Sequence, residues 1–122
     1  MRFNLKLIGV ASTPDIRAYV EKRINSLDKF IDKNDRSVFA DVEIGQTTRH
    51  HHSGPIFRAE INLHLAGRKL RAVAVGEDLY AAIDEMKDET HRELVSHKDK
   101  RVSLVRRGAR QIKDLIRRIY PF

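Results

Sequence analysis

Three groups of side chains have the types and spacing needed to bind or act on a ligand. The first is a run of cations in residues 98–110, KDKRVSLVRRGAR, which holds six basic side chains and one acidic one. The second is a run of three histidines at residues 50–52, and the third is a set of carboxylates: Asp41, Glu43 and Glu60. Dense positive charge attracts polyanions, whereas histidines and carboxylates are ligands for metal ions. The sequence therefore offers one candidate anion-binding segment and two candidate metal sites.

The excess positive charge of the chain is confined to its C-terminal part. The whole sequence holds 24 Lys+Arg against 17 Asp+Glu, which gives a net charge of +7. Residues 1–97 hold 15 side chains of each sign, whereas residues 98–122 hold nine basic and two acidic ones. A neutral body with a basic arm predicts a polyanionic partner, either nucleic acid or an anionic membrane surface. The alternative is a solvated tail that only aids solubility.

The histidines and the carboxylates are weaker candidates than the cations. Successive residues of an extended segment point to opposite sides, so three consecutive histidines rarely hold one ion. The segment TTRHHHSGP is typical of a hairpin tip between two strands, where histidines are solvated or stack on RNA. Arg58 and the cations of the fourth predicted strand are expected beside the carboxylates, which favours cross-strand ion pairs over a metal-dependent nuclease. We therefore predict no cofactor and no metal.

Length and composition set the broad class. A chain of 122 residues corresponds to one domain with a single core. It has no cysteine, which excludes disulfides and thiolate metal sites. The first residues, MRFNLKLIGV, interrupt their apolar side chains with Asn4 and Lys6, and no apolar run reaches the length of a membrane span. We expect a cytoplasmic, monomeric protein.

The elements that position these residues follow from the apolar periodicity. Apolar and polar residues alternate over residues 3–7, 38–44 and 57–65, and a shorter strand is predicted over 69–75. Each long strand has one apolar and one polar face, so one side of the sheet is expected to face water. We expect strands 1 and 2 to be parallel and the remaining strands to form a meander.

Two helices complete the predicted fold. Thr13 is suited to cap a helix, Pro14 suits its first position and Asp15 suits its positive end, so the first helix is predicted over about 14–31. The second helix begins after Gly76 and has an inner stripe of apolar residues and one threonine: Leu79, Ile83, Met86, Thr90 and Leu94. The predicted fold class is α+β, with the order β-α-β-β-β-α. One four-stranded mixed sheet carries two helices on one face, followed by a basic amphipathic helix or tail.

The tail itself is patterned. Its apolar residues fall on one helical face: Leu104, Val105, Ala109, Ile112, Leu115, Ile116 and Ile119. Its cations fall on the other face, and the pattern is interrupted at Gly108 and ends before Pro121. Such a helix can fold against RNA or a ribosomal protein, lie on an anionic membrane, or pack on the body of the protein itself.

The sequence resembles the ribosome hibernation-promoting factor and ribosome-associated inhibitor family over roughly residues 1–101. On the first helix the resemblance lies in TPDIRAYVEKRINSLDKF, and on the second it lies in GEDLYAAIDEM followed by HRELVSHK. The motif G-E-D-x-Y-x-A-I-D is the more specific of these, and the first-helix motif alone is weak. The fold of that family is the β-α-β-β-β-α arrangement predicted from the periodicity.

The resemblance implies a translation inhibitor without catalytic activity, which binds the small ribosomal subunit in the mRNA and tRNA channel while cells are starved. Its implied partners are the subunit and its rRNA, with ribosomal proteins as a further class. It implies phosphate contacts from cations on the helices and the segment that follows: Arg23, Lys29, Arg92 and Lys98. We add Lys87 of the second helix as a further candidate. We add to this set the cations of the tail: Lys100, Arg101, Arg106, Arg107, Arg110 and Lys113.

This chain departs from the family pattern in two ways. The family usually has a basic residue where this chain has Glu89, and another where it has Val95 or Ser96. The second helix is therefore less basic than the resemblance implies, and the tail is expected to compensate. No second, dimerisation domain of the long family members is visible, so we predict two parts: a ribosome-binding domain over 1–101 and a basic tail over 102–122.

Two alternative functions stay open at this point. The first is a different RNA-binding module with the same layered fold, which recognises structured RNA by its shape. The second is a small metal-dependent nuclease that uses the carboxylates. Cosedimentation with ribosomes separates the favoured function from the first alternative, and a magnesium-dependent cleavage assay tests the second.

Overall fold

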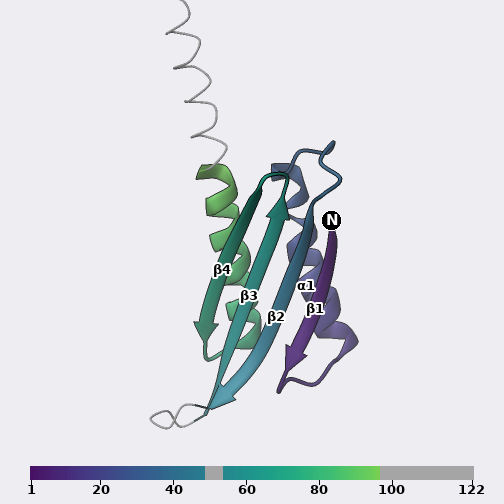
Figure 1. Cartoon of the computed structure of the whole chain (residues 1–122). Coiled ribbons are helices and arrows are strands. Elements are labelled where there is room, and N and C mark those ends of the chain that lie inside the picture. Colours follow the sequence, from purple (N-terminus) through teal and green to yellow (C-terminus); the bar gives the residue numbers. More distant parts are fainter. Residues whose placement is uncertain (49–53, 97–122) are drawn as a thin grey trace, which may run out of the picture.

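The computed structural model describes residues 1–48 and 54–96, which form one sheet covered on one face by two helices (Figure 1). The strands are β1 (Arg2–Ile8), β2 (Phe39–Thr48), β3 (Pro55–Leu65) and β4 (Arg68–Gly76). They lie in the order β1-β2-β3-β4, with β1 parallel to β2 and the other neighbours antiparallel. The predicted α+β class, the mixed sheet and the meander are confirmed.

The first helix, α1 (Pro14–Asn25), begins as predicted. The hydroxyl of Thr13 accepts a hydrogen bond from the backbone N–H of Ile16 at 3.2 Å, and Pro14 occupies the first turn. Both features satisfy the N-terminal end of a helix, whose first N–H groups have no partner within the helix. The start of α1 is therefore fixed by its own sequence.

The predicted C-terminal end of this helix at residue 31 is wrong. The α-helix ends at Asn25, and a short 3₁₀ helix, η1 (Asp28–Phe30), follows it. The hydroxyl of Ser26 donates to the carbonyl of Arg23 at 2.6 Å, and the N–H of Leu27 bonds to the carbonyl of Ile24 at 3.0 Å. Leu27 is still fully buried, so the helical spacing of apolar residues continues past the end of the α-helix. The backbone hydrogen bonds there join residues three apart, as in a 3₁₀ helix.

The second helix comprises residues 79–96 and packs beside α1 on the same face of the sheet (Figure 1). The carboxylate of Asp78 accepts a hydrogen bond from the N–H of Tyr80 at 3.2 Å at its start. The hydroxyl of the buried Thr90 donates to the carbonyl of Met86 at 2.8 Å, which explains how a polar residue fits the inner stripe. No helix within residues 1–48 and 54–96 is long and apolar enough to cross a membrane.

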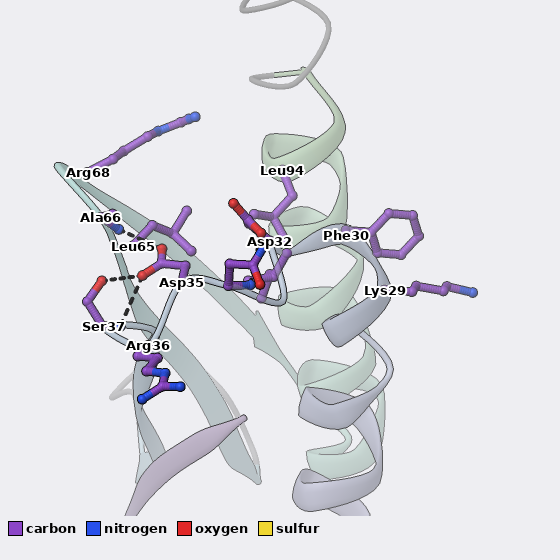
Figure 2. A pocket seen from close by; sticks show the side chains of 12 residues that line it. Lys29, Phe30, Asp32, Asp35, Arg36, Ser37, Leu65, Ala66, Arg68 and Leu94 are labelled. Carbon is purple, nitrogen blue, oxygen red and sulfur yellow. Dashed lines mark hydrogen bonds between the residues drawn. The ribbon is translucent and has the colours of Figure 1, made fainter.

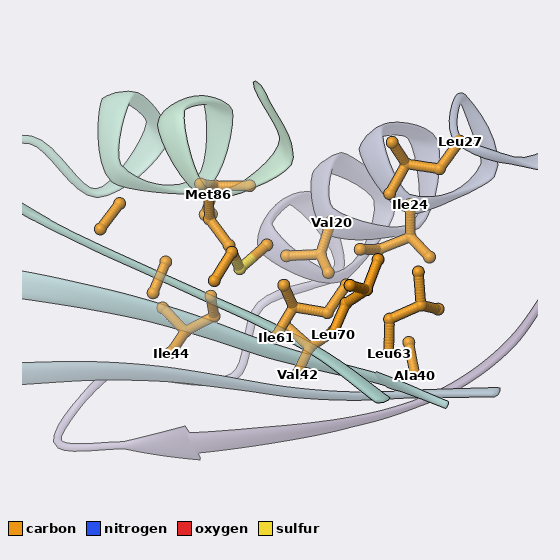
Figure 3. Packing of buried hydrophobic residues seen from close by; sticks show 14 of the residues in the cluster. Val20, Ile24, Leu27, Ala40, Val42, Ile44, Ile61, Leu63, Leu70 and Met86 are labelled. Carbon is orange, nitrogen blue, oxygen red and sulfur yellow. The ribbon is translucent and has the colours of Figure 1, made fainter. Parts of the chain in front are cut away.

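The core lies between the sheet and the two helices (Figure 3). Val20 and Ile24 of α1 and Met86 of the second helix meet strand residues that are almost fully buried, among them Ile44 and Ile61. Every buried apolar side chain in the described part of the chain falls between residues 16 and 94. The core of the described residues is therefore built from the sheet, α1, the residues that follow it and the second helix.

The strand directions bring distant parts of the sequence to one edge of the sheet. Arg2 pairs in register with Phe39, Phe39 with His64, and His64 with Lys69. The starts of β1, β2 and β4 therefore lie beside the end of β3. At this edge the turn between β3 and β4 passes through Gly67, whose φ of 68° is a conformation that glycine adopts readily.

Candidate functional site

Arg23, the first cation implied by the resemblance, is bound to an acidic side chain of the other helix. Its Nε lies 2.8 Å from a carboxylate oxygen of Asp84, and its Nη2 donates to the hydroxyl of Tyr19 at 3.1 Å. That hydroxyl in turn donates to Asp84 at 2.6 Å. The rings of Tyr19 and Tyr80 meet edge to face, with centroids 4.8 Å apart. We call these four residues the interhelix seam.

Two residues of the seam, Tyr19 and Arg23, have shifted pKa values. The hydrogen bond to Asp84, together with burial, raises the pKa of Tyr19 above its ordinary value. The hydrogen bond to Tyr19 and the charge of Asp84 raise the pKa of Arg23, although burial opposes this shift. The guanidinium of Arg23 therefore already interacts with Asp84 and Tyr19 within the protein.

The two cations predicted on the second helix are also paired. Arg92 lies 2.8 Å from Glu89, one turn earlier, and this hydrogen bond raises the pKa of Arg92 despite burial. Lys87 lies 3.5 Å from the carboxylate of Asp88. Glu89, one of the positions predicted to depart from the family pattern, is therefore the partner of Arg92.

A different region of the body holds cations that have no carboxylate partner in the described part of the chain. At the edge where β1, β2 and β4 start, six basic residues lie in η1, in the loop that follows it or at the starts of β1 and β4, and we call them the cationic end: Arg2, Lys29, Lys33, Arg36, Arg68 and Lys69. None of them takes part in an ion pair within residues 1–48 and 54–96. Of the cations predicted from the resemblance, only Lys29 belongs to this group, and its Nζ lies 5.2 Å from the ring centroid of Phe30.

The acidic residues at this end are occupied by other groups. Asp28 binds the N-terminal amine at 3.3 Å, and Asp32 accepts a hydrogen bond from the N–H of Asn34 at 2.9 Å. Asp35 accepts hydrogen bonds from the hydroxyl of Ser37 at 2.5 Å and the N–H of Ala66 at 2.9 Å. These bonds hold the pKa of Asp35 below its ordinary value. The acids fix the loop and the terminus, and the cations stay available to a ligand.

A pocket of about 780 Å³ opens beside the cationic end (Figure 2). Leu65 and Asp35 lie on its sheet side, and Leu94 reaches it from the second helix. Arg68 extends from the turn between β3 and β4, and its Nη1 is shielded from solvent without a hydrogen-bond partner in the described residues. Ile31 is a further apolar residue of the lining. The pocket therefore combines an apolar part with a cationic rim.

Of the three carboxylates predicted on the open face of the sheet, Glu60 forms the predicted ion pairs, Asp41 contacts His64, and Glu43 forms no ion pair among the described residues. Glu60, whose side chain is only 12% exposed, binds Arg71 at 2.5 Å and Arg58 at 3.1 Å. Burial raises the pKa of Glu60, but the hydrogen bonds from Arg71 and Arg58 outweigh burial and leave it below the ordinary value. Asp41 lies 3.3 Å from Nε2 of His64 and accepts from Asn4 at 3.2 Å. Within the described ranges no group of three or more residues is arranged to hold a metal ion.

Several predicted site residues lie outside the described residues. These are the histidines at 50–52 and the C-terminal cations: Lys98, Lys100, Arg101, Arg106, Arg107, Arg110 and Lys113. Their roles stay predictions.

Sequence reasoning missed most of the cationic end. Arg2 begins β1, Arg36 precedes β2, and Arg68 with Lys69 begins β4, so no sequence window contains them together. A usable signal existed nevertheless. The predicted strand order places the starts of strands 1, 2 and 4 at one edge, and each of these starts carries a cation. Lys29, Lys33 and Arg36 were also close enough in sequence to suggest a basic loop.

Comparison with known proteins identifies the family. The chain belongs to the family described as sigma 54 modulation protein / S30EA ribosomal protein, whose model matches residues 3–102. It is 33% identical over 100 residues to the ribosome hibernation promoting factor of Klebsiella oxytoca, which covers 82% of this chain and 96% of that protein. It is 27% identical over 100 residues to the ribosome hibernation promotion factor of Bacillus subtilis, covering 82% of this chain but 50% of that protein. The resemblance inferred from the sequence is confirmed.

Solved structures agree with this assignment. The crystal structure of the N-terminal domain of Thermus thermophilus Protein Y superposes with a TM-score of 0.65 at 28% identity, covering 77% of this chain and 96% of that one. A Coxiella burnetii protein described as a ribosomal subunit interface protein superposes with a TM-score of 0.60 at 19% identity, covering 81% and 99% of the two chains. The second likeness concerns the fold alone. Both matched chains are covered almost completely, so the β-α-β-β-β-α domain is the shared unit.

Proposed function

We propose that this protein is a non-catalytic ribosome hibernation factor that acts in the cytoplasm. In this proposal it occupies the mRNA and tRNA channel of the small subunit and contacts rRNA phosphates. Family membership and the names of the relatives support ribosome hibernation. The small subunit, the channel and the phosphate contacts follow from the resemblance and from the charge distribution of this chain.

The observation that carries the phosphate contacts is the cationic end. A cation already paired with a carboxylate must break that pair before it can bind a phosphate, whereas an unpaired cation only releases water and counterions. The six members of the cationic end have no carboxylate partner among the described residues. The second helix ends on the same side, beside the pocket that Leu94 lines, so the tail cations follow from there. We propose that the cationic end and the tail form one rRNA-binding surface.

We assign the interhelix seam a role that competes with phosphate binding, because Asp84 already binds the charge of Arg23. Arg23 and Asp84 connect α1 to the second helix, and both helices deliver the chain to the cationic end. In this assignment Arg23, Lys87 and Arg92 contribute less to phosphate binding than the resemblance implies. Their carboxylate partners already satisfy much of their charge.

We also propose that residues 1–101 fold without the tail. All buried apolar residues of the described chain lie between residues 16 and 94, so deleting 102–122 removes none of them. We expect the shortened protein to unfold cooperatively on heating, with a melting temperature close to that of the full chain. A shortened protein that lacks a cooperative thermal transition would contradict the division.

Cosedimentation with purified ribosomal subunits tests the function. We expect the protein to pellet with small subunits, not with large subunits, and to be displaced by excess mRNA and tRNA. The variant Lys29→Glu, Lys33→Glu, Arg36→Glu should lose most of this binding. Binding to large subunits with equal affinity, or to unrelated structured RNA as tightly as to small subunits, would favour a general RNA-binding module.

The matched control reverses three cations that are also unpaired among the described residues but lie elsewhere: Lys6, Arg17 and Lys22. All three are exposed, so this control changes the net charge by the same amount and leaves the core intact. We expect the control to bind small subunits more tightly than the first variant. Equal losses in both variants would show that only net charge matters and would contradict the proposed surface.

A further inference from the structure

The pocket beside the cationic end is formed by three segments that meet without filling the space between them. Ile31 comes from the loop after η1, Leu65 and Ala66 come from the β3–β4 turn, and Leu94 comes from the last described turn of the second helix. This apolar part opens at the end of the domain, where two helices and a sheet stop. The core below it is complete, because Leu27 and Leu63 are fully buried there.

The chain itself supplies an apolar segment next to this opening. Leu94 lines the pocket, and residues 97–122 follow directly after the second helix. Residues 97–103 are polar or charged apart from Val102, and about two to eight residues are enough to connect two packed helices. After this connection the sequence places apolar residues on one helical face, beginning with Leu104 and continuing through Ile112 and Ile116.

We propose that the apolar face of residues 104–119 docks into this pocket, against Ile31, Leu65 and Leu94. Two features of the pocket fit this occupant. The apolar lining residues Ile31, Leu65 and Leu94 match the apolar face of the tail. Nη1 of Arg68 lacks a partner among the described residues, and a backbone carbonyl or Asp99 of the incoming segment can accept its hydrogen bond.

Docking in this orientation has an electrostatic consequence. With the apolar face against the pocket, the arginines of the opposite tail face point outward beside Lys29, Arg36 and Arg68. Like charges then repel across the rim, and added salt screens that repulsion. Docking of the tail should therefore become stronger as salt rises, whereas phosphate binding by the same cations becomes weaker. The docked tail would extend the cationic end into one continuous surface.

A spin label in the full-length protein tests the docking without any ribosome, so its failure is distinguishable from failure of the proposed function. The sequence has no cysteine, so Gln111→Cys gives one labelling site on the polar side of the tail. We expect the nitroxide to weaken the amide NMR signals of Ile31, Ala66 and Leu94 severalfold, and more at higher salt. The signals of Gly9 and Gly45, at the opposite end of the sheet, should keep their intensity.

Two variants serve as controls. The first, Ile112→Ser with Ile116→Ser, keeps every cation of the tail and should restore the weakened signals. The second, Ala66→Arg, places a long side chain at the exposed turn of the pocket and should restore them too. If Ala66→Arg fails to fold, the tail variant alone decides the outcome.

Three results would overturn the docking: unchanged pocket signals in the labelled protein, equal weakening at both ends of the sheet, or weakening that survives the Ile112→Ser, Ile116→Ser variant. A fourth is found by mixing spin-labelled protein with isotope-labelled protein that carries no spin label. Weakening of the pocket signals in this mixture would identify the tail of a second copy as the occupant.

Discussion

The interhelix seam and the cationic end contain the same kinds of residues but use them differently. At the seam the carboxylate of Asp84 binds the guanidinium of Arg23 and the hydroxyl of Tyr19. At the cationic end the carboxylate of Asp35 binds Ser37 and the backbone of Ala66, and Arg36 and Arg68 have no carboxylate partner among the described residues. The charges of Arg23 and Asp84 are therefore paired across two helices, whereas Arg36 and Arg68 form no ion pair among the described residues.

We infer from this difference that the number of cations in a region is a poor measure of its attraction for phosphate. What matters is whether the neighbouring carboxylates are bound to cations or to backbone amides. A paired arginine must lose its ion pair with a carboxylate when it binds a phosphate, so the net gain in binding free energy is only the difference between the two interactions. An unpaired arginine gains the full free energy of its interaction with the phosphate. The following predictions test whether the two regions divide stability and binding in this way.

The largest effect on ribosome binding should come from the tail, which we propose to be part of the same rRNA-binding surface as the cationic end. Reversing Arg106, Arg107 and Arg110 to Glu should remove about three phosphate contacts. At about 0.7 to 0.9 per contact, the slope of log K against log salt should become shallower by about 2 to 3. The melting temperature should barely change, because exposed charges contribute little to folding.

Binding of the same variant to liposomes separates RNA from membrane. Small-subunit affinity should be measured between low and near-physiological salt, and liposomes of anionic lipid should be tested in parallel. Unchanged ribosome affinity with lost liposome binding would assign the tail to a membrane surface and break its connection with the cationic end.

A smaller effect should distinguish paired from unpaired cations within the body. Neutralising Lys33 and Arg36 to Gln should make the salt slope shallower by about 1.5, which corresponds to two phosphate contacts. Neutralising Lys87 and Arg92 to Gln removes the same charge, but both are bound to carboxylates, so the slope should change by less than half as much. Equal changes in the two double variants would mean that the carboxylate partners release these cations on the ribosome.

Much of the fold was predictable because its signals are local. Alternating apolar residues predict each strand, and Thr13 with Pro14 fixes the start of α1 within a few residues of sequence. The end of α1 was not predictable from the same spacing. Leu27 faces the core whether the backbone is α-helical or 3₁₀, so the apolar pattern continues past the true end.

The candidate site was less predictable because its pairs are distant in sequence. Arg23 and Asp84 are separated by most of the domain, so only the packing of two helices shows that Arg23 is already bound. Glu89 and Arg92 are three residues apart, and here the sequence alone indicated that the second helix had lost positive charge. The strand order places Arg2 and Lys69 at one edge of the sheet. Whether this edge is a candidate site depends on the side chains around these cations, which the strand order does not give.

Glu60 on the open face of the sheet should affect stability and not binding. Glu60→Gln leaves two arginines without their carboxylate, so we expect a loss of about 1 to 2 kcal/mol in the free energy of unfolding. The pKa of Glu60 is lowered in the folded state, so its contribution is complete above the unfolded pKa of about 4.3. It is lost as the pH falls through the folded value.

Thermal unfolding of the wild type and of Glu60→Gln between neutral and acid pH measures this contribution. The difference between them should shrink as the pH is lowered, and small-subunit binding at neutral pH should be no weaker in the variant. A stability difference that grows towards acid pH would contradict the sign of the shift.

The smallest effect, and the sharpest test of the comparison, concerns Asp84. Asp84→Asn keeps a hydrogen-bond acceptor for Tyr19 but removes the charge that binds Arg23. Both members of that ion pair are more than a third exposed, so the free energy of unfolding should fall only slightly. Ribosome affinity should rise slightly, because Arg23 becomes available to phosphate and the body loses one negative charge.

The matched control Glu21→Gln, which is exposed on α1, removes the same charge without touching the seam. If both variants bind small subunits equally, Arg23 lies away from the rRNA; if Asp84→Asn binds more weakly than Glu21→Gln, the seam positions the binding surface instead of competing with it.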